Sequence, residues 1–283
     1  LCKFLLNENI DFVAIENNRK ISNLLKKDIQ IMKGSINSIK LNDNILYNID
    51  CIINLSGISD KSYCENNPEL AYKVNCDGVE NLLNIIKLYP NIKLIHLSSS
   101  EVYKHKNNLL YKESDHTSSE NVYGKTKIKA EKLITNYSVK YQLNSTIIRL
   151  FNTFGYSPFK NNFFNNVLSR ALRNEDIILK NMRKKIDFIY IKDVINAIYL
   201  IYKSNYSNKL VNICSSKPIS LLEFTKKIVN SSNSSSNIII NDSTSELNKT
   251  IVGSNLLAKD LYSWIPKFDY ESALFDTLNN ERY

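Results

Sequence analysis

Short, continuous apolar runs recur along the first half of the chain, and each ends in small or polar residues. They cover Ile10–Asn17 (IDFVAIEN), Asp50–Gly57 (DCIINLSG), Asn91–Tyr103 (NIKLIHLSSSEVY) and Asn144–Gly155 (NSTIIRLFNTFG). Unbroken runs of Ile, Leu and Val are typical of strands that are buried on both faces, whereas half-exposed strands alternate. The pattern therefore predicts a parallel β-sheet with both faces covered.

Helical patterns separate these runs. Residues 67–89 (NPELAYKVNCDGVENLLNIIKLY) and 121–141 (NVYGKTKIKAEKLITNYSVKY) have helical spacing, and residues 1–9 (LCKFLLNEN) form a further amphipathic pattern. Alternation of strand and helix predicts an α/β fold with a doubly wound parallel sheet. Because ligands bind beyond the carboxyl ends of the strands in such sheets, we expect the LSG, SSS and FNTFG segments to converge there.

After about residue 156 the alternation becomes less regular. Residues 161–175 have a helical pattern, residues 186–204 read as a short strand running into a helix, and residues 211–230 as a strand, a proline turn and a helix. We assign residues 1–155 to the sheet domain and residues 156–283 mainly to a smaller C-terminal lobe, part of which returns to the sheet.

Composition excludes several classes of protein. The hydrophobic fraction of 43% and the charged fraction of 23% are ordinary for a globular protein. We find no apolar run of membrane-spanning length and no visible signal peptide, so we expect no membrane association. Five cysteines without a Cys-x-x-Cys pair, together with only three histidines, argue against a disulfide framework or a metal site. They favour a reducing, cytoplasmic setting.

The formal net charge of +9 has two interpretations. It indicates either an anionic partner, such as a phosphorylated small molecule or nucleic acid, or a solvated surface rich in lysine. The lysines are spread along the chain, and no nucleic-acid recognition motif or platform of aromatic and basic residues is present. We therefore do not expect nucleic-acid binding.

Three residues form a candidate proton-transfer site. Ser99 ends a predicted strand, Tyr123 begins a predicted helix, and Lys127 follows one helical turn later. A lysine ammonium close to a phenol stabilises the phenolate and lowers the tyrosine pKa from about 10. A serine hydroxyl can hold a substrate oxygen while the tyrosine moves the proton.

The chain resembles the short-chain dehydrogenase/reductase superfamily, in particular the extended NAD-dependent epimerases and dehydratases of nucleotide sugars. The resemblance covers essentially the whole chain and rests on segments in the family order. These are INLSG (53–57), VNCDGVENLL (74–83), SSSEVY (98–103), NVYGKTKIKAEKL (121–133), RLFNTFG (149–155), DFIYIKDV (187–194), VNICSSKPIS (211–220) and WIPKFDYESAL (264–274). It implies a Rossmann-like dinucleotide-binding domain over residues 1–155, a substrate-binding lobe over 156–283, and a homodimer.

The resemblance also implies roles for individual residues. Tyr123 is the general acid/base, Lys127 tunes it and holds the cofactor ribose, and Ser99 binds the reacting sugar oxygen. The implied cofactor site comprises Glu16, Leu55, Ser56, Gly57, Asn75, Tyr123 and Lys127; the implied substrate site comprises Ser99, Ser100, Asn152 and Lys185. An acidic Glu16 favours NAD, whereas Arg19 and Lys20 keep NADP as a possibility.

The chain departs from the family at several positions. The glycine-rich phosphate loop, Gly-x-x-Gly-x-x-Gly after a first strand, is not in the sequence. We expect the chain to be truncated at its N-terminus and to bind its dinucleotide poorly. Ser35 occupies the place of an Asp that contacts adenine, and Ile186 occupies the place of an Arg for the substrate phosphate, with Lys185 as the basic neighbour.

The residues near Ser99 leave the reaction open. Glu101 occupies a place where the family's 4,6-dehydratases and uronic-acid decarboxylases carry a Glu, which in dehydratases can remove the proton next to the new ketone. We expect an epimerase or dehydratase that acts on a nucleotide sugar. The competing hypotheses are a 4-keto-sugar nucleotide reductase, a uronic-acid decarboxylase, or a non-catalytic regulatory protein that binds a dinucleotide or a sugar nucleotide.

Overall fold

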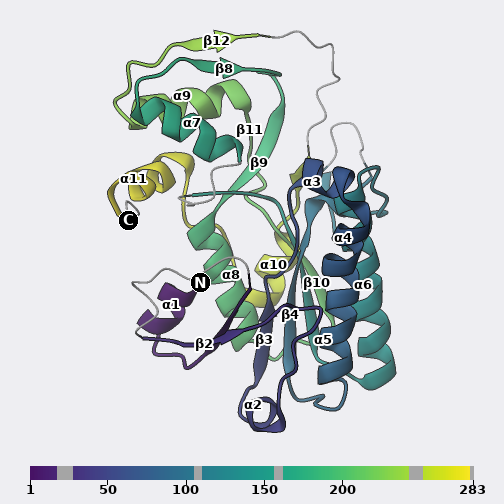
Figure 1. The fold of residues 1–283 in the computed structure, drawn as a ribbon. Coiled ribbons are helices and arrows are strands. Elements are labelled where there is room, and N and C mark those ends of the chain that lie inside the picture. The colour runs from purple at the N-terminus through teal and green to yellow at the C-terminus, as the bar shows by residue number, and fades with distance from the viewer. Residues whose placement is uncertain (18–27, 105–109, 156–161, 242–250, 281–283) are drawn as a thin grey trace. The chain divides into compact units, whose positions relative to one another are not determined.

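The computed structural model of the protein describes residues 1–17, 28–104, 110–155, 162–241 and 251–280 (Figure 1). They belong to two compact units, each assembled from three segments of the chain. The first unit comprises Leu1–Val102, Thr117–Ile147 and Ile201–Lys209, and the second comprises Tyr103–His116, Ile148–Leu200 and Leu210–Tyr283. The chain therefore leaves and re-enters each unit.

Parallel strands form the sheets of the first unit. The strands are β1 (Val13–Glu16), β2 (Gln30–Lys33), β3 (Cys51–Asn54), β4 (Lys93–Ser99) and the first residues of β6 (Ser145–Leu150). Strand β1 pairs in parallel with β2, β3 pairs in parallel with β4, and β4 lies between β3 and β6. The predicted α/β class with a parallel, Rossmann-like sheet is confirmed.

The helices of the first unit follow the predicted alternation. They are α1 (Cys2–Asn7), α2 (Asp43–Tyr47), α3 (Lys61–Asn66), α4 (Pro68–Tyr72), the π-helical turn η1 (Lys73–Asp77), α5 (Gly78–Ile86), the 3₁₀ turn η2 (Ser100–Val102) and α6 (Val122–Tyr141). Helices α4, α5 and α6 lie side by side in Figure 1. The Asn121 side chain caps α6 by accepting a hydrogen bond from the Gly124 N–H at 2.7 Å.

The helical segment expected over residues 67–89 is interrupted. The π-helical turn η1 separates α4 from α5 and contains Asn75. A π turn widens the helix by one residue, and such turns are frequent at functional sites. Here the Asn75 side chain makes hydrogen bonds to two distant segments, at Ile58 and Thr126.

The second unit is a mixed arrangement of short strands and helices. Its strands are the last residues of β6, with β5 (Leu110–Tyr111), β7 (Asn152–Phe154), β8 (Ile177–Leu179), β9 (Lys185–Tyr190), β10 (Lys209–Ile213), β11 (Pro218–Ser220), β12 (Ile238–Ile240) and β13 (Val252–Gly253). Its helices are α7 (Phe163–Leu172), most of α8 (Ile191–Lys203), α9 (Leu221–Ser231), α10 (Leu256–Tyr262) and α11 (Tyr270–Asn280). No helix in the part of the chain that the structure describes combines the length and the apolar character needed to cross a membrane.

The run expected as one strand over residues 144–155 is two strands. The Phe151 N–H donates to the Ile213 carbonyl oxygen of β10 at 3.1 Å, and from Asn152 onward the chain pairs in parallel with β9 as β7. Strand β11 pairs antiparallel with β9 on its other side, so these three strands form a separate sheet. The change of partner at Phe151 depends on distant strands, and the local sequence pattern does not show it.

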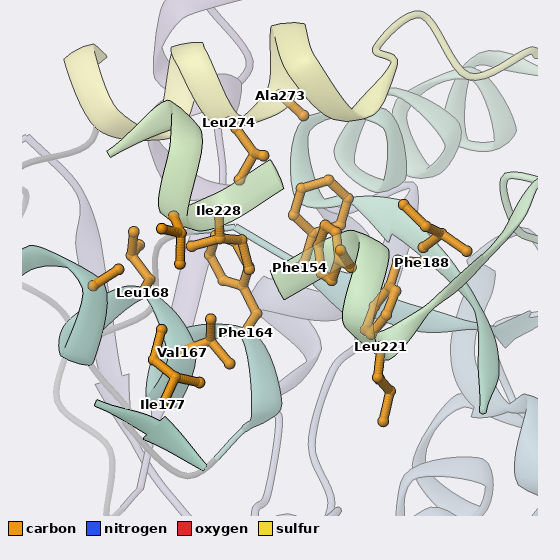
Figure 2. Packing of buried hydrophobic residues seen from close by; sticks show 14 of the residues in the cluster. Phe154, Phe164, Val167, Leu168, Ile177, Phe188, Leu221, Ile228, Ala273 and Leu274 are labelled. Atoms are coloured by element: carbon orange, nitrogen blue, oxygen red, sulfur yellow. The ribbon is translucent and has the colours of Figure 1, made fainter. Parts of the chain in front are cut away.

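A cluster of aromatic and aliphatic side chains forms the main core of the second unit (Figure 2). The ring centroids of Phe188 and Phe224 lie 4.4 Å apart, and those of Phe154 and Phe224 lie 5.2 Å apart. Helices α7, α9 and α11 contribute Phe164, Phe224 and Leu274, all of them buried. Burial of such large apolar surfaces is the main favourable contribution to folding.

A buried carboxylate joins three segments of the second unit. Asp187 in β9 accepts hydrogen bonds from the backbone N–H groups of Ser215, Ser216 and Gly253 and from the Ser215 hydroxyl. Burial raises the pKa of Asp187, and the hydrogen bonds from Ser215 and the backbone counteract this. A buried charge with this many donors is compensated, so Asp187 holds β9, the segment before β11 and β13 together.

Replacing Phe224 by Ala is expected to lower the free energy of unfolding by about 3–5 kcal/mol, because the ring is fully buried among other aromatic side chains. Urea denaturation measures the change. Phe275→Ala is the control, since that side chain is 68% exposed and its loss should change stability by less than about 1 kcal/mol. Equal losses in the two variants would contradict the assigned core.

Candidate active site

The end of strand β4 positions the candidate serine. Ser99 is the last residue of β4, and the 3₁₀ turn η2 begins directly after it. The Glu101 N–H donates to the Ser99 hydroxyl oxygen at 3.2 Å. Because a hydroxyl accepts and donates at the same time, its own proton is left to be donated onward. The neighbouring Ser100 is buried inside the turn.

Helix α6 places Tyr123 and Lys127 on one face, four residues apart. Gly124 lets this helix approach η2 closely, since a Cβ atom there would lie 2.4 Å from the Glu101 carbonyl oxygen and 2.1 Å from the Ser119 hydroxyl oxygen. No side chain fits in that space. The glycine therefore brings the first turn of α6 against the end of β4, where Ser99 lies.

The phenol of Tyr123 is buried, with 8% of the residue exposed. Burial raises the pKa of Tyr123 to about 12, and the hydrogen bond with the Ser99 side chain counteracts this only in part. The neighbouring groups Glu101 and Cys64 raise the pKa of Tyr123 further, so the predicted lowering of this pKa is wrong for the chain by itself. Tyr123 is therefore protonated at neutral pH, and Ser99 lies next to it.

The ammonium of Lys127 is also buried, and its Nζ lies 6.0 Å from the centroid of the Tyr123 ring. Burial lowers the pKa of Lys127 to about 8. Among the described residues its Nζ reaches one acceptor, the Leu97 carbonyl oxygen at 2.8 Å. An ammonium carries three N–H donors, so this cation retains donors for a ligand.

Glu101 takes part in an ion pair next to Tyr123. Its Oε1 accepts from Lys61 Nζ at 2.6 Å, and its Oε2 accepts from the Asn121 side chain at 3.0 Å. The Glu101 side chain is 13% exposed, whereas the Lys61 side chain is 54% exposed. The carboxylate thus connects the start of α3 to the N-cap of α6, and it retains further lone pairs for a proton.

The segment after β3 borders Lys127. Gly57 has φ +148°, and a Cβ there would lie 3.1 Å from Asn75 Oδ1 and 3.4 Å from Lys127 Nζ. The Asn75 amide nitrogen donates to the Ile58 carbonyl oxygen and to the Thr126 hydroxyl, both at 3.0 Å, and its Oδ1 accepts from the Ile58 N–H at 2.8 Å. Asn75 therefore fixes the Gly57–Ile58 segment against α6.

The other predicted site residues lie in both units. In the first unit Leu55 and Ser56 are exposed after β3, and Glu16 is buried at the end of β1. In the second unit Asn152 is exposed on β7, and Lys185 is exposed at the start of β9. Arg19 and Lys20, which would favour NADP, lie outside the described residues.

Sequence reasoning missed four polar residues that belong to this region. Lys61 binds Glu101, Asn54 makes a hydrogen bond to His96 at 3.1 Å, and Glu131 accepts a hydrogen bond from Ser98. Only Glu131 has a detectable sequence signal, because it continues the four-residue spacing of Tyr123 and Lys127. The other partners are far apart in the chain and meet only in the fold.

Comparison with known proteins decides the family. The family model described as "NAD dependent epimerase/dehydratase family" matches residues 1–214. The chain belongs to the NAD-dependent epimerase/dehydratase family. Two curated relatives are a low-salt glycan biosynthesis protein of Haloferax volcanii, 24% identical over 71% of this chain, and a dTDP-D-glucose 4,6-dehydratase of Dictyostelium discoideum, 26% identical over 81%. The chain spans 65% and 56% of the lengths of these relatives.

Solved structures share the fold of this epimerase/dehydratase family member. UDP-glucose 4-epimerase of Thermotoga maritima, solved with UDP-glucose, matches with a TM-score of 0.87 at 17% identity, covering 99% of this chain and 93% of its own. UDP-glucose 4-epimerase of Thermus thermophilus, solved with NAD, matches with a TM-score of 0.85 at 16% identity, covering 99% and 94%. At these identities the likeness establishes the fold.

The family name implies NAD as a cofactor. The described residues of the first unit fit its ribose. The buried Lys127 ammonium has donors to spare, and the absence of a side chain at Gly57 lets this ammonium lie beside the segment after β3. Ribose hydroxyls can accept hydrogen bonds from such donors. The glycine-rich loop that would hold the pyrophosphate is not in the 283-residue sequence.

The buried Lys127 predicts a pH-dependent stability. Its pKa is lowered from 10.5 to about 8 in the folded chain, so between these values the unfolded chain binds more protons. Stability contributed at this position therefore rises as pH increases from 8 to 10.5. Lys127→Met removes the buried charge and with it this rise. The free energy of unfolding of the variant minus that of the unchanged chain should therefore fall by up to roughly 3 kcal/mol over this pH range.

Urea denaturation at pH values from 7 to 10.5 measures this difference. Lys125→Met is the matched control, because Lys125 is exposed on the same helix. The pH dependence for Lys127→Met is compared with that for Lys125→Met. A constant difference for Lys127→Met would show that Lys127 has the same pKa folded and unfolded.

Proposed function

We propose that the chain is an NAD-dependent enzyme that acts on nucleotide sugars as an epimerase or dehydratase. The observation that carries this proposal is the grouping of Ser99, Tyr123 and Lys127 at one buried place in the first unit. A phenol, an adjacent hydroxyl and a buried cation suit the transfer of a proton to and from a sugar oxygen. Membership of the family supports the cofactor, and relatives that act on or bind nucleotide sugars support the substrate class.

Each side chain has a defined task in this reaction. The Ser99 hydroxyl donates a hydrogen bond to the reacting sugar oxygen and so holds that oxygen beside Tyr123. The Tyr123 oxygen, in its phenolate form, takes the proton from the sugar hydroxyl as the alcohol becomes a ketone. In an epimerase it returns this proton when the same ketone is reduced. Lys127 stabilises the phenolate form through its charge. Bound NAD would accept the hydride from the sugar; in an epimerase it would return the hydride to the same carbon, and in a dehydratase to the carbon that has lost water.

The cofactor contacts are assigned to the exposed segment Leu55–Gly57, to Lys127 and to Glu16, with Asn75 holding Gly57 and Ile58 in place. Glu16 ends β1, which corresponds to the second strand of the family's dinucleotide-binding domain. A carboxylate at this place accepts hydrogen bonds from ribose hydroxyls, so we assign NAD rather than NADP. Asn152 and Lys185 of the second unit are proposed contacts of the nucleotide sugar. The homodimer and the cytoplasmic location stay predictions.

One observation favours a second reaction. In the chain by itself burial keeps the pKa of Tyr123 at about 12, so the phenol is ready to donate a proton. A 4-keto-sugar nucleotide reductase begins its reaction from this protonation state, because it protonates the new alkoxide. A uronic-acid decarboxylase and a regulatory protein that binds without turnover are the two remaining candidates, and the product assay distinguishes them.

The proposal is tested by product mass. The chain is assayed as the 283-residue polypeptide and after fusion behind a family strand and glycine-rich loop, with NAD or NADPH. A panel of nucleotide sugars and 4-keto derivatives is offered. Unchanged mass with a new chromatographic peak identifies an epimerase, loss of water a dehydratase, loss of carbon dioxide a decarboxylase, and gain of two hydrogens a reductase. Binding without any product from either polypeptide would favour the regulatory protein.

Replacing Tyr123 by Phe is expected to lower turnover by about 100- to 10,000-fold, because the phenol oxygen carries the proton. Calorimetric titration with the nucleotide sugar should show binding within about threefold of the unchanged chain. Tyr137→Phe is the matched control on the same helix, since its hydroxyl bonds Asn84 in an exposed place. Turnover that survives Tyr123→Phe would remove this residue from the mechanism.

Replacing Glu101 by Gln separates a dehydratase from an epimerase. If Glu101 removes the proton next to the new ketone, the rate of water loss should fall by at least about 100-fold. An epimerase does not use this base, so its rate should change by less than about threefold. Lys61→Met is the control, because it breaks the ion pair with Glu101 and leaves the carboxylate in place. A dehydratase that tolerates Glu101→Gln would exclude Glu101 as its base.

A further inference from the structure

The buried face of helix α6 continues beyond the tyrosine and the lysine. Tyr123, Lys127 and Glu131 follow one another at intervals of four residues, which places them in one row along the helix. Glu131 is 6% exposed. A carboxylate is costly to bury unless hydrogen bonds and charges compensate it, so this position in the interior requires partners.

One partner of Glu131 lies on the strand that carries the candidate serine. The Ser98 hydroxyl donates to Glu131 Oε1 at 2.5 Å, and Ser98 is itself buried. Ser98 directly precedes Ser99, so this hydrogen bond joins the end of β4 to the second turn after Tyr123. A charge-assisted hydrogen bond of this kind fixes its two partners more strongly than a neutral one.

Glu131 also faces the buried cation. Cys76 of η1, Cys64 of α3 and Glu131 of α6 all favour the charged form of Lys127, and His96 of β4 lies close enough to feel its charge. Burial raises the pKa of both thiols, that of Cys76 to about 11, and lowers the pKa of His96 well below its ordinary value. These three groups are therefore neutral at pH 7, as is Tyr123, whose pKa burial raises to about 12.

Among the described groups that favour the charged form of Lys127, Glu131 is the carboxylate. We propose that Glu131 is a positioning residue of the proton-transfer site: its carboxylate holds Ser98, and with it the end of β4, while its charge keeps the Lys127 side chain protonated. The chemical consequence rests on the proposed function, because a charged Lys127 is what stabilises the Tyr123 phenolate. The electrostatic part concerns the chain alone and can be measured without cofactor or substrate.

The test compares two pairs of variants in urea denaturation between pH 6.5 and 10.5, without ligand. The stability difference between the unchanged chain and Lys127→Met begins to change with pH where folded Lys127 loses its proton. Its slope against pH reaches half of the full value, here called the midpoint, at about pH 8. The same difference between Glu131→Gln and the double variant with Lys127→Met should have its midpoint at least about half a pH unit lower. Gln preserves the shape of the side chain and removes the charge.

Three further variants make the result specific. Glu80→Gln, an exposed acid on α5, should leave the midpoint unchanged. Ser98→Ala keeps the charge and loses the hydrogen bond, so its shift should be smaller than that of Glu131→Gln; an equal shift would overturn the role of the charge. If Glu131→Gln does not fold, Glu131→Asp is used instead. Its side chain is one methylene shorter, which moves the carboxylate away from Lys127 and should still lower the midpoint.

An unchanged midpoint in Glu131→Gln, with stability lowered equally at every pH, would overturn the proposal and leave Glu131 a purely structural residue. Failure of the proposed function is a separate outcome. If no nucleotide sugar is converted and the midpoint still moves, the electrostatic role of Glu131 is supported and the proposed reaction is contradicted.

Discussion

A positive charge enclosed by protein is the constraint on which the candidate site depends. The ammonium of Lys127 lies where burial disfavours its charged form, and the Leu97 carbonyl oxygen meets only one of its donors among the described residues. Such a group destabilises the folded chain unless its surroundings compensate it. The surroundings here include the Tyr123 ring, the Glu131 carboxylate and the backbone of Gly57, whose missing side chain leaves room for the ammonium.

Close approach of backbone segments makes this enclosure possible. Gly124 brings the start of α6 within van der Waals distance of the Glu101 carbonyl group, and Gly57 allows Asn75 and Lys127 to lie against the segment after β3. Asn75 then uses both donors of its amide and its oxygen to hold Ile58 and Thr126. The same contacts that build the first unit thus place the phenol and the hydroxyl together, so stability and chemistry share these residues.

The second unit is stabilised by different means. Its core is a group of aromatic rings at close distances, and its buried carboxylate Asp187 is satisfied by four donors from Ser215, Ser216 and Gly253. Asn152 and Lys185 are exposed on the small sheet that this core supports. A rigid sheet with exposed polar side chains is suited to substrate recognition, whereas the buried polar row of α6 is suited to proton transfer.

Local periodicity was sufficient to predict much of this protein. Buried strands and helices have different repeats, so the parallel sheet, the helix of residues 121–141 and the shared face of Tyr123 and Lys127 follow from the sequence alone. Only the tertiary structure decided which polar side chains are buried. The π turn around Asn75, the change of sheet at Phe151, and the pairing of Ser98 with Glu131 all depend on contacts between residues far apart in the chain. The burial of individual polar side chains and their long-range hydrogen bonds leave no periodic signal in the sequence, because they depend on which segments the folded chain brings together.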